Sequence, residues 1–130
     1  MTIREVSEKY GLSQDTLRYY ERVGMIPPVN RTAGGIRNYT EEDLSWVELA
    51  KCMRSAGLPV EAMIEYVRLF REGDSTLSAR LQLLTKQREA LLEQRRHIDA
   101  TLERLNYKIE HYEEAVRTGT LNWNAPKDSK

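Results

Sequence analysis

The 130-residue sequence contains a single cysteine, Cys52, so an intrachain disulfide is impossible. This shortage excludes the disulfide-stapled scaffolds typical of small secreted proteins. No uninterrupted apolar run approaches the roughly 20 residues of a membrane span, and the sequence does not open on an apolar signal region. We therefore expect a cytoplasmic protein that has no membrane partner.

Patterns for catalysis, metals and cofactors are also missing. We find no nucleophile paired with a base and no glycine-rich loop that would cradle a phosphate. The two histidines, His97 and His111, are too far apart on one predicted helix to form a metal site together, and we expect both to be solvated or at the edge of a helix pair. The sequence therefore predicts no enzyme, no metal and no cofactor.

Neither sign of charge dominates, because the formal net charge is +0. Such a balance does not favour nucleic-acid binding, which usually needs a basic domain. The distribution is uneven, however, since residues 1–39 carry six cations and four anions. This modest positive excess is useful only if the fold gathers it on one surface.

Residues 2–24 predict two short helices that are separated by a glycine turn. Thr2 and Glu5 form a capping box at the first helix, Gly11 ends it, and Ser13 caps the second. The outer face of the second helix carries arginine, tyrosine and amide groups that suit phosphates and base edges, while Leu17 points inward. This is the helix-turn-helix pattern, in which the second helix enters the major groove of DNA. An ordinary helical hairpin is the alternative.

Residues 29–39 predict a small β-hairpin around Gly34-Gly35, after two prolines that force an extended chain. Its arms carry Arg31, Arg37 and Tyr39, which can donate hydrogen bonds to phosphates. We interpret this segment as a wing beside the helix-turn-helix. The alternative is a solvated loop with incidental arginines.

Two further helices follow the predicted wing. Thr40 and Asp43 form the capping box of a third helix, with a buried face that would include Val47, Met53 and Ala56. Gly57 ends this helix, and Pro59 lies in the first turn of a fourth helix that Gly73 closes. The apolar stripe of the fourth helix consists of Met63, Ile64, Val67 and Phe70.

The last predicted helix carries a heptad pattern that signals a coiled coil. Its seam residues are Leu77, Leu81, Leu84, Arg88, Leu91, Arg95, Ile98, Leu102, Leu105, Ile109, Tyr112 and Val116. A helix of this length extends about 60 Å, more than a small domain can cover, so the seam needs a partner helix, most simply from a second copy. The expected domains are 1–73 for DNA binding, 74–118 for dimerisation through the nine apolar seam residues from Leu77 to Tyr112, and a 119–130 tail. In that tail Trp123 would dock on a neighbour.

With these elements placed, the chain resembles the MerR family of transcription regulators from end to end. The resemblance rests on residues 17–21 (LRYYE), 24–28 (GMIPP), 37–44 (RNYTEEDL) and 57–61 (GLPVE) in this order. It implies a mainly α protein with a winged helix-turn-helix and a long antiparallel coiled-coil helix. It also implies a homodimer that binds a palindromic promoter operator and distorts the spacer DNA so that RNA polymerase can use it.

Carried onto this sequence, the resemblance places candidate DNA contacts on the second helix and on the wing, and it implies that Tyr20 is packed inside. The candidate DNA-binding residues are Thr2, Gln14, Asp15, Arg18, Tyr19, Arg31, Arg37 and Tyr39. The rival interpretation is a structural or adaptor protein that is built on the coiled coil and has no specific DNA target.

Residues 51–54, 57–59 and 64–73 together resemble the aldehyde- and nitric-oxide-responsive branch of the family, the NmlR/AdhR type. In that branch a cysteine at the position of Cys52 is proposed to sense electrophiles. Lys51 and Arg54 are cations that favour a reactive thiolate, whereas Glu48, one turn earlier, opposes it. The alternative is a small, inert residue beside the core.

Overall fold

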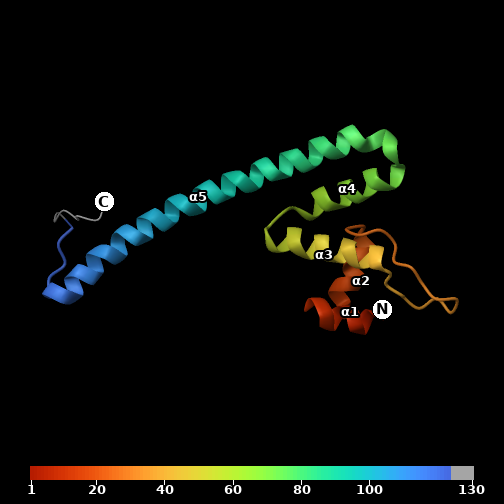
Figure 1. The fold of residues 1–130 in the computed structure, drawn as a ribbon, viewed down its shortest axis with the longest axis horizontal. Coiled ribbons are helices and arrows are strands. Elements are labelled where there is room, and N and C mark those ends of the chain that lie inside the picture. The colour runs from red at the N-terminus through yellow and green to blue at the C-terminus, as the bar shows by residue number, and fades with distance from the viewer. Residues whose placement is uncertain (124–130) are drawn as a thin grey trace. The chain divides into compact units, whose positions relative to one another are not determined.

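The structure is a computed structural model, and it describes residues 1–123. The chain is mainly helical, in the order α1 (Ile3–Tyr10), α2 (Gln14–Val23), α3 (Glu41–Ser55), α4 (Val60–Glu72), a short 3₁₀ turn η1 (Asp74–Thr76) and α5 (Leu77–Thr118) (Figure 1). It divides into two compact units, Met1–Leu91 and Leu92–Lys130, and α5 contributes residues to both. Within residues 1–123 no helix is long and apolar enough to span a membrane.

The predicted caps fix the first two helices. The Thr2 hydroxyl accepts a hydrogen bond from Glu5 N at 3.1 Å, and the Glu5 carboxylate accepts one from Thr2 N at 2.8 Å. The Ser13 hydroxyl accepts one from Thr16 N at 3.0 Å. Gly11 takes a φ of 67°, a left-handed conformation that ends α1 at little cost for a glycine. Helix, turn and helix are therefore confirmed where the sequence placed them.

A core within the first unit holds α1 to α4 together. Val6 of α1, Leu17 of α2 and Val47 of α3 are all fully buried. The segment after α2 adds Met25 and Ile26 to this core. Both side chains are buried, and both residues come directly before the two prolines. The inward direction of Leu17 and the packing of Tyr20, which is 6% exposed, are confirmed.

Residues 29–39 form a loop and not the predicted β-hairpin. One isolated antiparallel bridge joins Arg31 to Arg37, and Thr32 N donates to Ile36 O at 2.8 Å. Only the ends of this segment are buried, at Val29 and Tyr39, whereas Ile36 between them is 67% exposed. A two-stranded hairpin whose middle has no apolar face to bury has marginal stability in water, which explains the single bridge.

The boundary of α3 differs from the prediction at one end of its buried face. Ala50 is fully buried, whereas Ala56 is exposed because α3 ends at Ser55 and the chain turns away at Gly57. Pro59 is the residue before α4 and not part of its first turn. Phe70 is 37% exposed, while Leu69, which the predicted stripe omitted, is buried.

In the second unit, Trp123 folds back onto the helix that precedes it. Its ring stacks on His111 at 5.0 Å between centroids and meets Tyr112 edge-on at 5.7 Å. Lys108 Nζ lies 4.5 Å from the centre of the same ring. Of the two environments predicted for His111, the solvated one is wrong, because His111 is only 4% exposed next to this ring, and the edge of a helix pair stays a prediction. The rest of the predicted tail, residues 124–130, lies outside the described residues.

Candidate nucleic-acid interface

The outer face of α2 presents two accessible arginines, Arg18 and Arg22, among polar side chains. Arg18 Nη1 lies 3.2 Å from Asp15 Oδ1, and Arg18 Nη2 lies 3.3 Å from Gln14 Oε1. The Arg18 side chain is 43% exposed and that of Asp15 is 97% exposed. Exposed pairs of this kind contribute little to stability, so a phosphate or a base edge can replace the partners of the guanidinium.

Tyr19 extends the same surface by one residue. It is 38% exposed, and the Arg22 guanidinium lies 5.4 Å from the centre of its ring. A cation over a ring holds a side chain at low entropic cost while its edge stays free for contact. The four α2 residues that the sequence singled out therefore share one accessible helix surface.

A carboxylate on α2, that of Glu21, holds the loop arginines. Glu21 Oε1 accepts a hydrogen bond from Arg37 Nε at 2.7 Å, and Glu21 Oε2 lies 3.6 Å from Arg31 Nη2. Glu21 Oε2 also accepts a hydrogen bond from Val29 N at 2.9 Å. Glu21 was not among the predicted DNA contacts, although its position one turn after the buried Leu17 places it on the inner side of α2.

One of the candidate contacts lies inside the fold, and a second makes a helix cap at the surface. Tyr39 is 2% exposed, and its buried hydroxyl has no hydrogen-bond partner among the described residues. Burial raises the pKa of Tyr39, and the Arg37 guanidinium opposes this effect. The Thr2 hydroxyl already accepts the hydrogen bond of its capping box. The structure therefore places Tyr39 in the core, away from the surface where a phosphate contact was expected.

Cys52 is exposed near the end of α3. The two neighbouring cations are directed to main-chain carbonyls, since Lys51 Nζ donates to Tyr10 O and Arg54 Nη1 donates to Leu58 O. The thiol is thus accessible to small reagents without an ion pair to either cation. Within residues 1–123, no group of three or more His, Cys, Asp or Glu side chains is placed to hold a metal ion.

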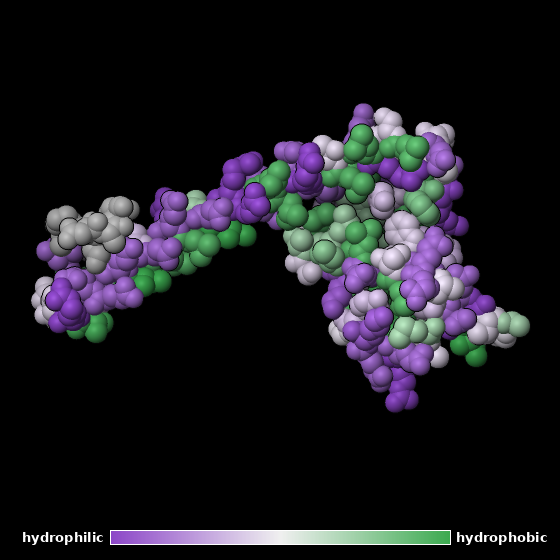
Figure 2. Space-filling view, in the orientation of Figure 1, coloured by the Kyte–Doolittle hydropathy of each residue, from purple (hydrophilic) through white to green (hydrophobic). Residues whose placement is uncertain are grey.

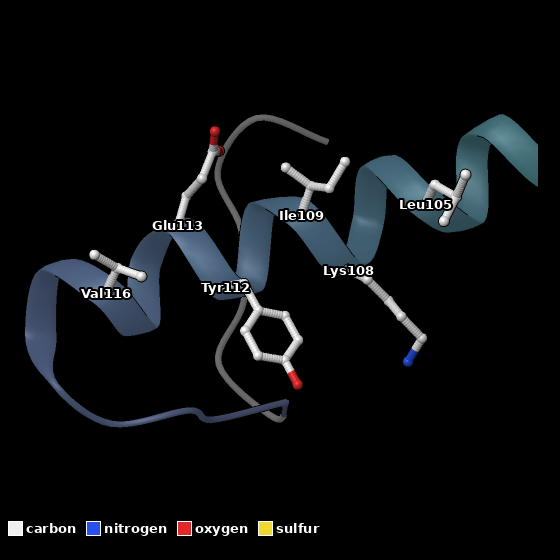
Figure 3. A pocket seen from close by; sticks show the side chains of 6 residues that line it. All are labelled: Leu105, Lys108, Ile109, Tyr112, Glu113 and Val116. Carbon is white, nitrogen blue, oxygen red and sulfur yellow. The ribbon is translucent and has the colours of Figure 1, made fainter.

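Most of the seam of α5 stays uncovered in the single chain. The exposed apolar seam residues range from 39% exposed at Leu91 to 85% at Val116, whereas Leu84 is partly buried. In the second unit, apolar residues follow one edge of the helix (Figure 2), and part of that edge forms a shallow groove (Figure 3). The groove is lined by Leu105, Lys108, Ile109, Tyr112, Glu113 and Val116.

Curated relatives of the chain are transcription regulators. The chain is 56% identical over 93 residues to the HTH-type transcriptional regulator AdhR of Bacillus subtilis, a match that covers 72% of this chain and 66% of AdhR. It is 31% identical over 120 residues to an uncharacterised HTH-type transcriptional regulator of Haemophilus influenzae, which covers 92% and 89% of the two chains. These relatives do not favour the adaptor alternative.

Solved structures repeat the fold over most of its length. A crystal structure of a Listeria monocytogenes protein assigned to the MerR family has a TM-score of 0.87 and 46% identity, covering 92% of this chain and 90% of that one. HiNmlR, a MerR family regulator that lacks the sensor domain and was crystallised bound to promoter DNA, has a TM-score of 0.83 and 31% identity, with coverage of 92% and 95%.

The family assignment covers the helix-turn-helix and the two helices after it. The family of MerR HTH regulatory proteins matches residues 1–69, which include the accessible face of α2, the loop arginines and Cys52. The relatives and the solved structures extend the similarity into α5. The chain belongs to the MerR family of DNA-binding transcription regulators, in the branch of AdhR and NmlR, and it is not an enzyme.

Proposed function

We propose that this chain is a cytoplasmic protein that binds a palindromic operator in promoter DNA as a homodimer. Binding would distort the spacer DNA so that RNA polymerase can use the promoter. The observation that carries the proposal is the half-exposed Arg18 on the second helix of a helix-turn-helix, a helix that also holds two loop arginines through Glu21. The similarity to promoter-bound HiNmlR supports the same use of this surface.

The interface residues divide by the chemistry that each can reach. Gln14, Asp15, Arg18 and Tyr19 of α2 would face the major groove, where amide and guanidinium groups read base edges. Arg31 and Arg37 of the loop would contact phosphates, which position a protein without reading sequence. Thr2 would lie at the margin of the interface, where its backbone and side chain cap α1. Tyr39 would support the loop from inside the core.

The decisive experiment selects duplexes from a random pool with the wild-type protein and then measures binding of variants to the selected palindrome. Arg18→Ala should lose about 1–3 kcal/mol on the selected site if Arg18 grips a base edge, or weaken all duplexes alike if it grips a phosphate. Arg4→Ala removes a highly exposed α1 arginine and serves as the control. Unchanged binding by Arg18→Ala would contradict the assignment of α2.

We also propose that Cys52 tunes this regulator in response to electrophiles such as aldehydes or nitrosothiols. The thiol is the only cysteine and is exposed, so modification would alter one defined site on α3. A single thiol can be alkylated, nitrosated or glutathionylated but cannot form an intramolecular disulfide. The resemblance to the aldehyde- and nitric-oxide-responsive branch supports this assignment.

Transcription in vitro from the selected promoter tests the thiol directly. Wild-type protein should change its output when an aldehyde or a nitrosothiol is added, and mass spectrometry should find the adduct on Cys52. Cys52→Ser and Cys52→Ala should bind the operator normally and lose the response. A full response in both variants would make Cys52 a packing residue and remove the sensor proposal.

A further inference from the structure

Glu21 accepts contacts from three separate points of the loop that follows α2. Its Oε1 atom binds Arg37 Nε at 2.7 Å, and its Oε2 atom binds Val29 N at 2.9 Å and faces Arg31 Nη2 at 3.6 Å. The Glu21 side chain is only 11% exposed. One partly buried carboxylate is therefore satisfied entirely by the loop.

These contacts lie next to the single backbone bridge that joins the two arms of the loop among the described residues. The isolated bridge joins the backbones of Arg31 and Arg37, and the side chains of the same two residues meet at Glu21. Because the backbone pairing of the arms is limited to this bridge, with Thr32 N donating to Ile36 O and Asn38 N to Asn30 O, the carboxylate adds a second connection between the arms. It ties both arms of the loop to the helix that presents Arg18.

The charge of Glu21 matters as much as its position. Two arginines share one carboxylate, so the cluster keeps one net positive charge instead of two. The Arg31 side chain is 42% exposed and that of Arg37 is 22% exposed, so both remain within reach of a phosphate. A fixed negative charge behind them weakens attraction to any phosphate that approaches from an arbitrary direction.

We infer that Glu21 is a positioning residue that sets the specificity of DNA binding. It holds Arg31 and Arg37 in one geometry, so that they meet phosphates only when α2 is seated in its groove. Its negative charge also weakens the attraction of both arginines to non-specific DNA. This inference rests on the proposed DNA interface, and it adds an acidic residue that would raise the ratio of specific to non-specific affinity without contacting DNA.

Glu21→Gln tests the charge, because the amide keeps the size of the side chain and one acceptor oxygen. Affinity for a duplex of random sequence should rise, and the ratio of affinities for the selected palindrome and the random duplex should fall several-fold. The logarithmic salt dependence of binding to the random duplex should steepen by about one, as expected for one additional released counterion. An unchanged salt slope and an unchanged ratio would overturn the inference.

Glu21→Asp separates position from charge and guards against a folding defect in the first variant. The shorter carboxylate keeps its charge but cannot reach both arms, so the salt slope should stay at the wild-type value while the affinity ratio falls. If both variants instead lose affinity for both duplexes alike, with a lower melting temperature and an unchanged slope, Glu21 is merely structural and the inference fails.

Two controls connect the effect to the arginines. Glu48→Gln makes the same change of charge on an exposed α3 residue and should leave the salt slope near that of the wild type. In an Arg31→Gln/Arg37→Gln background, Glu21→Gln should no longer steepen the slope, and a persistent effect would contradict the inference. If the wild-type protein selects no sequence at all, the proposed operator fails, while the slopes on random duplex still decide the role of Glu21.

Discussion

At the residue scale, the carboxylate of Asp43 ties the loop before α3 to the start of that helix. It accepts hydrogen bonds from Thr40 N at 2.9 Å, Asn30 N at 3.2 Å and Asn30 Nδ2 at 3.1 Å. Asp43 is 6% exposed, and burial alone would raise the pKa of its carboxyl. The hydrogen bonds from Thr40 and Asn30 outweigh burial, so the pKa lies below its ordinary value of 3.8.

A carboxyl with a lowered pKa in the folded state stabilises the protein above its unfolded pKa and loses that contribution as the pH falls. Asp43→Asn should therefore lower the free energy of unfolding by about 1–3 kcal/mol at neutral pH. The difference from the wild type should shrink as the pH falls through 3.8 and below. Urea unfolding at several pH values measures both effects.

Asp99→Asn on the exposed surface of α5 is the matched control and should change stability little at any pH. If Asp43→Asn cost the same free energy at neutral and acid pH, the charged form of Asp43 would have no special role in the cap.

At the element scale, the last turns of α5 are covered on one side by Trp123. Tyr107 and His111 point away from the seam, because 100° per residue places them on the opposite face of the helix from Leu105 and Ile109. Trp123 stacks on both of them, at 6.1 Å and 5.0 Å between centroids. Trp123 therefore covers this side of the helix near its end and touches Tyr112 at the edge of the seam, while Ile109 and Val116 of the seam stay exposed.

Trp123→Ala should expose His111 and fray the end of α5. Each aromatic pair contributes about 0.5–1.5 kcal/mol beyond its buried area, so the loss of these stacks should lower helical content and melting temperature measurably. Circular dichroism follows the helix, and the fluorescence of Trp46, the only other tryptophan, reports on the first unit.

Trp123→Phe keeps an aromatic ring on the cluster and should preserve most of the helix. Equal helical content and equal melting temperatures in the wild type, Trp123→Ala and Trp123→Phe would show that this packing does not stabilise α5.

At the scale of the whole molecule, the open seam of α5 predicts assembly into the proposed homodimer. Ile109 is 51% exposed and Leu105 is as well, in the middle of the stripe in the second unit. Apolar burial contributes about 25 cal/mol per Å², so a charge placed there would remove much of the drive for pairing. Ile109→Lys should therefore shift the protein toward monomer and weaken operator binding, as measured by sedimentation and DNA titration.

Ala100→Lys introduces the same charge on the opposite face of α5 and should remain a dimer. A monomeric wild-type protein, or an unchanged dimer in Ile109→Lys, would contradict the assignment of this seam as the dimer interface.

The sequence by itself determined the helices, because their signals are local. A capping hydroxyl such as Ser13, a turn glycine such as Gly11 and the inward Leu17 act within a few residues, so the helix-turn-helix and the long seam could be predicted. The combination of these local motifs also identified the family.

Only the tertiary structure decided which side chains the loop after α2 brings together. The contact of Glu21 with Arg31 and Arg37, and the burial of Tyr39, depend on the path of a chain that returns to α2 from beyond two prolines. Whether two short strands pair into a hairpin depends on whether they can bury an apolar face. The alternation of polar and apolar residues in a short loop does not reveal this. His111 is likewise buried between Tyr107 and Trp123, and Trp123 reaches it from 12 positions later by folding back onto the helix. Helix capping and periodicity depend on residues that are close in the sequence. These contacts depend instead on which distant segments the folded chain brings together.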